Sequence, residues 1–129
     1  MLSKRKLFRI TIALIGIHSL LLGIFIFFKT GLFYRIFFNA EISNLFFVKQ
    51  SGLFLFLSGL FYLFPLINSK KMCDISVLII LSKTLAVVFL ISYAGLAPGS
   101  KMIYWAAILD GLMAALLTIT YLMFKKEAR

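Results

Sequence analysis

The sequence contains only one cysteine, Cys73, and only one histidine, His18. A single cysteine excludes an internal disulfide and a CxxC redox pair, because both need two thiols in one chain. These two residues also cannot supply the ligands of a structural zinc site. The sequence therefore predicts no metal centre.

Acidic residues are scarce as well, with four Asp and Glu in 129 residues. Glu41 and Glu127 fall in a loop and a tail and Asp74 at a helix start, which leaves Asp110 as the acid within an apolar segment. No glycine-rich phosphate loop, paired catalytic carboxylates or Ser/His/Asp arrangement is present. These absences argue against an enzyme and predict no catalytic residue and no cofactor.

Charged residues are too few to cover a water-soluble domain. They make up 14% of the chain, while 63% is hydrophobic and the mean hydropathy is +1.07. The formal net charge of +10 comes from basic residues at the ends of apolar segments, where they meet anionic lipid headgroups. We therefore predict a membrane protein that contacts lipids and has no nucleic-acid partner.

Four apolar segments are long enough to cross a bilayer, which takes about 20 residues of helix. They cover residues 7–28, 45–67, 74–96 and 102–124. The predicted fold is an all-α, integral membrane four-helix bundle in a single transmembrane domain, residues 1–129.

Local signals predict where these helices begin and end. Gly31 suits a left-handed cap after the first span, and Pro65 ends or bends the second. Asp74 is a candidate N-cap for the third span, and 98–100 forms a turn before the fourth. Residues 31–44 carry Leu32, Phe33, Ile36 and Phe37 at helical spacing, which predicts a short interfacial helix between spans one and two. We expect this helix to serve either as a cap over the bundle, or as a gate or docking face for a partner.

The distribution of Lys and Arg predicts the orientation. Three basic residues flank the spans on one side: Lys29, Arg35 and Lys101. Nine lie on the other side: Lys4, Arg5, Lys6, Arg9, Lys70, Lys71, Lys125, Lys126 and Arg129. By the positive-inside rule, both termini are cytoplasmic, in the inner membrane of a bacterium. The apolar run after the basic N-terminus is interpreted as an uncleaved span rather than a signal peptide.

Polar residues within the spans mark the candidate site. At 1.5 Å per residue, Lys83 lies roughly 13 Å and Asp110 roughly 12 Å deep, on antiparallel neighbouring helices. Charges at this depth need a partner, so we expect an ion pair. His18 lies near mid-depth on the first span, while Gln50 and Lys49 lie in the outer third of the second. These polar residues have three possible interpretations. They form a structural ion pair with hydrogen-bonded neighbours, a site for a small molecule or proton, or a contact with another subunit.

Stripes of small residues predict where helices approach closely. The first span has Gly16, Ser19 and Gly23, and the second has Gly52 and Gly59. The fourth carries Ala106, Asp110 and Ala114 at four-residue spacing, beside Ala107, Gly111 and Ala115. Asp110 is therefore expected to face the bundle interior.

The layout of four spans, the polar entry Lys49-Gln50-Ser51-Gly52 with Gly59, and the first-span glycines Gly16 and Gly23 are similar to the DoxX-like group of small four-helix membrane proteins. Some members of that group are accessory subunits of quinone-linked oxidoreductases. The resemblance thus implies a hydrophobic ligand or a subunit role, and it transfers no catalytic residue.

The leading functional hypothesis is a protein that binds a quinone or lipid, or an accessory subunit of a membrane complex, with His18, Gln50, Lys83 and Asp110 lining the interior. One alternative is a small proton-coupled transporter working as a homo-oligomer. Another is a purely structural or assembly factor.

Overall fold

The chain folds into four long helices and one short helix in the part that the computed structural model describes, residues 3–96 and 101–127. The elements are α1 (Lys4–Phe28), α2 (Thr30–Phe38), α3 (Leu45–Ile67), a 3-10 turn (Ser69–Lys71), α4 (Met72–Leu96) and α5 (Lys101–Glu127). The four long helices are each long and apolar enough to cross a membrane. The all-α fold and the short helix after the first span are confirmed, and the protein is a multi-pass membrane protein.

The connection between α1 and α2 differs from the expected glycine cap. Gly31 lies inside α2 with no positive φ, because the chain starts a new helix at Thr30 directly after α1 ends. The Thr30 hydroxyl donates to the carbonyl oxygens of Ile26 (2.8 Å) and Phe27 (3.0 Å), which satisfies acceptors at the end of α1. The left-handed residue is Asn39, with φ 49°, where α2 ends.

The turn between α3 and α4 also corrects one expectation. Asp74 is not an N-cap but lies in the first turn of α4, since the 3-10 turn lets that helix begin at Met72. Pro65 lies in the last turn of α3, which ends at Ile67 as predicted. There the Arg9 guanidinium donates to the Leu66 carbonyl oxygen over 3.0 Å, tying α1 to this end of α3. The expected turn at 98–100 lies outside the described residues.

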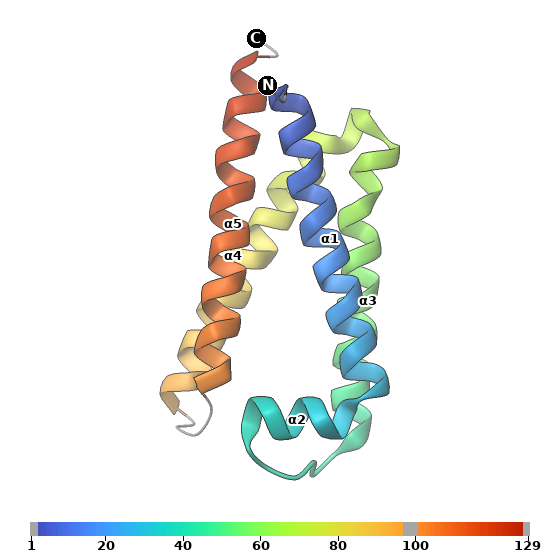
Figure 1. Ribbon diagram of the computed structural model, residues 1–129, viewed down its shortest axis with the longest axis vertical. Helices are drawn as coiled ribbons and strands as arrows, with labels where there is room; N and C mark the ends of the chain where they lie inside the picture. The colour runs from blue at the N-terminus through green and yellow to red at the C-terminus, as the bar shows by residue number, and fades with distance from the viewer. Residues whose placement is uncertain (1–2, 97–100, 128–129) are drawn as a thin grey trace.

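The helices form two antiparallel pairs, α1 with α3 and α4 with α5 (Figure 1). Both chain ends and the α3–α4 turn lie at one end of the molecule, which we call the terminal end. At the opposite end, α2 runs across the bundle and extends from the α1–α3 pair toward α5. We call this the α2 end. The pairs lie close together at the terminal end and diverge toward α2.

Glycines hold α1 and α3 in close contact, as the small-residue stripes predict. A Cβ atom on Gly23 would lie 2.8 Å from the Gly52 carbonyl oxygen, and one on Gly59 would lie 2.9 Å from that of Gly16. No real side chain tolerates such distances to backbone atoms. The backbones can therefore approach only because these positions have no side chain.

The buried core lies at the terminal end of the bundle. It joins α1, α3, α4 and α5 through large side chains with little or no solvent exposure: Phe8, Ile12, Ile15, Tyr62, Met72, Ile75, Ile79 and Leu117. Phe8 stacks on Phe124 with ring centroids 5.1 Å apart. This packing closes one half of the bundle and leaves the other half open for a site.

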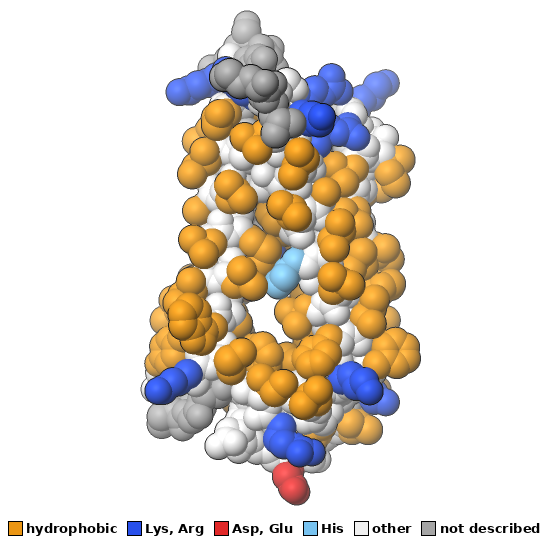
Figure 2. All heavy atoms as spheres, viewed as in Figure 1, with side chains coloured by type: hydrophobic (Ala, Val, Ile, Leu, Met, Phe, Trp, Pro, Cys, Tyr) orange, Lys and Arg blue, Asp and Glu red, His pale blue; other side chains and the backbone are white. Residues whose placement is uncertain are grey.

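The outer surface has the distribution expected of a bilayer protein. Apolar side chains cover a broad belt, and Lys and Arg side chains gather at the two ends (Figure 2). Within the belt, residues such as Leu21 and Leu81 have 62% and 54% of their surface exposed. Lipid chains can cover these side chains, whereas water could not do so favourably.

Candidate functional site

The two membrane charges form the predicted ion pair. Lys83 Nζ on α4 donates to Asp110 Oδ1 on α5 over 2.7 Å. The Lys83 side chain is 6% exposed and that of Asp110 is 17% exposed. Each charge removes much of the cost of burying the other, because an unpaired charge in a medium of low dielectric constant is far less stable.

His18 lies on α1 and is not among the residues that line the cavity described below. Its side chain is half-buried, and its Nδ1 atom is buried without a hydrogen-bond partner in the described residues. The neighbouring Ser19 hydroxyl is likewise buried without a partner there. Buried polar atoms are nearly always satisfied, so these two atoms are candidates to contact water or a ligand.

A cavity of about 500 Å³ occupies the α2 half of the bundle. All five helices contribute to its wall, and Figure 2 shows the molecular surface hollowed in this half. Among its lining residues, Asp110 carries the charge, and Ser51, Tyr34 and Tyr93 add hydroxyl groups. The rest of the wall is apolar.

Aromatic rings close the α2 end of this cavity. Phe33, Tyr34, Phe37 and Phe38 come from α2, and Tyr93 comes from α4. The Phe38 and Tyr93 rings meet edge to face with centroids 6.1 Å apart, which links α2 to α4. The short helix therefore forms the floor of the cavity in addition to covering the end of the bundle.

Gln50 and Lys49 lie elsewhere. They line a second groove with Phe27, Phe46, Leu53 and Phe54, on the outer side of the α1–α3 pair. The Lys49 ammonium lies 5.6 Å from the centre of the Phe27 ring. Depth along the helix, which the sequence gives, does not settle which side a residue faces. The structure thus pairs Lys83 with Asp110, places Asp110 but neither His18 nor Lys83 in the wall of the cavity, and places Gln50 and Lys49 in a different groove.

Two features of the structure were not anticipated from the sequence. One is the role of Tyr34, Phe38, Phe89 and Tyr93 in the cavity wall. The four-residue spacing of the α2 aromatics was a usable signal, but it does not show which face the bundle would enclose. The other is a hydrogen bond of 2.7 Å between the Tyr62 and Ser82 hydroxyls, which joins α3 to α4.

The arrangement of this site suits the recognition of an apolar molecule. An apolar cavity with a single carboxylate can hold an oily molecule and fix the position of one polar group on it. Among the described residues, no three His, Cys, Asp or Glu side chains come close enough together to hold a metal ion.

Comparisons with family models, with curated proteins and with solved structures find no match for this chain. The resemblance to DoxX-like proteins is therefore not supported beyond a layout of four apolar helices. What is shown is a small polytopic membrane protein with an all-α fold and no family assignment.

Proposed function

We propose that this protein binds a hydrophobic small molecule of the quinone or lipid class inside the bundle. The observation that carries the proposal is the cavity of about 500 Å³ with the Asp110 carboxylate in its wall. Ligand pockets typically measure about 300–1,000 Å³ and combine apolar walls with a few placed polar groups. The cavity has this size and this composition.

The walls select for an oily ligand. Leu22, Ile26, Leu55 and Leu90 line the sides, and the α2 aromatics form the floor. A water-soluble metabolite would lose its hydration here without gaining hydrogen bonds, whereas a quinone ring or an acyl chain loses little. Aromatic rings also favour a planar ring through offset or edge-to-face contacts.

The ion pair gives the ligand an orientation. Asp110 lines the cavity, whereas Lys83 is more deeply buried and is not among the lining residues. A hydroxyl on the ligand, such as that of a quinol or a lipid headgroup, can donate to the Asp110 carboxylate, whose Oδ1 already accepts from Lys83 Nζ. The pair is neutral overall, so the site does not require a charged ligand.

The same contact weighs against proton-coupled transport through Asp110. A carboxylate that exchanges protons with substrate must separate from any partner during the cycle, whereas Asp110 is held in a 2.7 Å contact with Lys83. An accessory-subunit role is compatible with ligand binding, and a purely structural role predicts none. The binding experiment below separates these alternatives.

The experiment is native mass spectrometry of the full chain released from mild detergent, with identification of the retained molecules. It is followed by titration with a decyl-substituted benzoquinol, whose hydroxyl groups can donate to Asp110. We expect one hydrophobic molecule per chain and saturable binding of the quinol. Ala106→Trp should lower the affinity roughly tenfold or more, because it places a large ring in the cavity and overpacking costs about 1–3 kcal/mol.

Ala115→Trp is the matched control, because Ala115 is exposed on the same helix and does not line the cavity. Loss of ligand in Ala106→Trp alone supports the proposal. A chain that carries no specific molecule, or one whose ligand is unaffected by either tryptophan, contradicts it and favours a structural role.

A further inference from the structure

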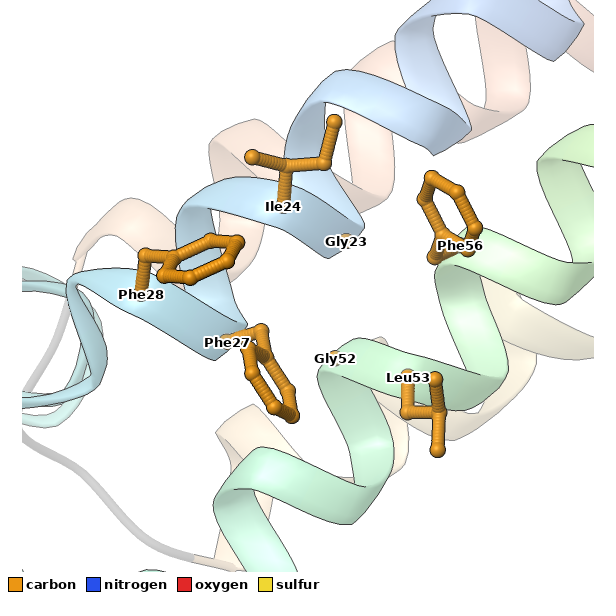
Figure 3. A pocket seen from close by; sticks show the side chains of 7 residues that line it. All are labelled: Gly23, Ile24, Phe27, Phe28, Gly52, Leu53 and Phe56. Atoms are coloured by element: carbon orange, nitrogen blue, oxygen red, sulfur yellow. The ribbon is translucent and has the colours of Figure 1, made fainter.

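A separate apolar groove opens on the outer side of the α1–α3 pair, away from the cavity. Its floor is formed where Gly23 and Gly52 face each other, and the side chains of Ile24, Phe27, Phe28, Leu53 and Phe56 surround this floor (Figure 3). The groove has a volume of about 190 Å³. It exists because two opposed glycines leave a recess between larger neighbours.

This groove adjoins a larger one toward the α2 end. Phe27 and Leu53 line both, and the second groove, of about 450 Å³, adds Lys49 and Gln50 to the wall. The walls of both grooves are apolar, and Lys49 and Gln50 bring a cation and an amide group to the residues around the groove nearer α2. Such an arrangement matches an amphiphile with an oily chain and an anionic head.

Lys49 is positioned for the head of such a molecule. Its ammonium lies 5.6 Å from the centre of the Phe27 ring, and Phe27 lines both grooves. The cation is therefore beside the apolar surface on which an acyl chain would lie. The neighbouring cation Lys29 is exposed at the end of α1 and adds positive potential at the same end of the molecule.

The length of the combined groove along the helix axis also suits a bilayer lipid. Lys49 and Phe56 are seven residues apart on α3, or about 10 Å along the helix axis. A phosphate at Lys49 would thus leave the first part of an acyl chain lying over the glycine floor, within the hydrocarbon layer.

We propose that this groove is a binding site for one anionic phospholipid of the leaflet at the α2 end. The acyl chain lies across Gly23 and Gly52, and the phosphate contacts the Lys49 ammonium and the Gln50 amide. The site does not depend on the ligand proposed for the cavity, since the two share no lining residue.

The test uses the full chain reconstituted in phosphatidylcholine vesicles with a trace of spin-labelled phosphatidylglycerol or spin-labelled phosphatidylcholine. Electron paramagnetic resonance measures the fraction of each label that the protein immobilises. We expect phosphatidylglycerol to be preferred about fivefold, the effect of roughly one basic residue at a membrane surface. Lys49→Gln should abolish the preference.

Lys101→Gln is the charge control, because it removes a cation at the same end of the molecule but outside the groove. Leu53→Trp should reduce immobilisation of both lipids by filling the groove. Leu116→Trp is its control, since both leucines are 46% exposed and Leu116 lies on α5. Equal association of the two lipids, or an equal loss in Lys49→Gln and Lys101→Gln, would overturn the proposal.

Discussion

Lys83 and Asp110 make a direct 2.7 Å contact across the interface between α4 and α5, in the middle of two helices long enough to cross a membrane. Both side chains are largely buried, and the nearby face of α5 carries small residues. Gly111 is one of them, and a Cβ atom there would make only ordinary contact with Val87, at 3.7 Å. The pair thus joins two helices at a depth where neither charge is stable alone.

Removing one charge of this pair should destabilise the protein more than removing both charges. Asp110→Asn and Lys83→Met each leave one buried charge without its partner, at a cost of about 3–5 kcal/mol. The double variant removes both charges and should recover most of that loss. Unfolding in detergent, followed by circular dichroism, gives the coupling free energy. Additive losses in the double variant would show that the charges do not stabilise each other.

The glycine contact between α1 and α3 should not tolerate a methyl group. In Gly23→Ala the new Cβ atom meets the backbone of Phe56 and Gly52 within 3 Å, so we expect a loss of about 1–3 kcal/mol. Gly95→Ala is the control, because nothing lies within 4 Å of the position. There the better helix propensity of alanine should leave stability unchanged or raise it by up to about 1 kcal/mol. Thermal unfolding of the two variants in one detergent measures the contrast, and equal transition temperatures would argue against close packing.

The Tyr62–Ser82 hydrogen bond should make a measurable contribution to the α3–α4 interface. Tyr62 is 6% exposed and its ring belongs to the core, so Tyr62→Phe keeps the packing and removes only the hydroxyl. We expect a loss of about 0.6–1.5 kcal/mol, the usual net value for a hydrogen bond in a protein or membrane. Tyr104→Phe, at an exposed position, is the control. A double cycle with Ser82→Ala checks whether the effect belongs to this contact.

Orientation is a prediction from charge that a reporter can test. Both chain ends lie at the terminal end with Lys70 and Lys71. One reporter at the C-terminus therefore shows on which side of the membrane this end of the molecule lies. A green fluorescent protein fused there should fluoresce in bacterial cells, because it folds in the cytoplasm. An alkaline phosphatase fusion at the same position should be inactive. The reverse pattern would place both termini outside and contradict the positive-inside assignment.

Several local signals in the sequence are overridden by the neighbouring chain. Gly31 is a good residue for a left-handed cap, yet it is helical, because Thr30 satisfies the carbonyl groups that a cap would otherwise serve. Asp74 suits an N-cap, but a 3-10 turn starts α4 two residues earlier. Such choices depend on which hydrogen-bond partners the connecting segment supplies, and residue type alone does not determine them.

By itself, the sequence determines the number, length and class of the helices, because apolar runs of about 20 residues with basic ends have one stable form in a bilayer. The predicted spans agree with the helices to within three residues at each end. It also places Lys83 and Asp110 at matching depth, since helical rise converts position into distance. Only the tertiary structure decides that the helix pairs diverge above α2, that aromatic rings from α2 and α4 close a cavity, and that Gln50 faces away from it. Those features depend on the rotation and tilt of each helix, which follow from packing between distant residues such as Gly23 and Gly52.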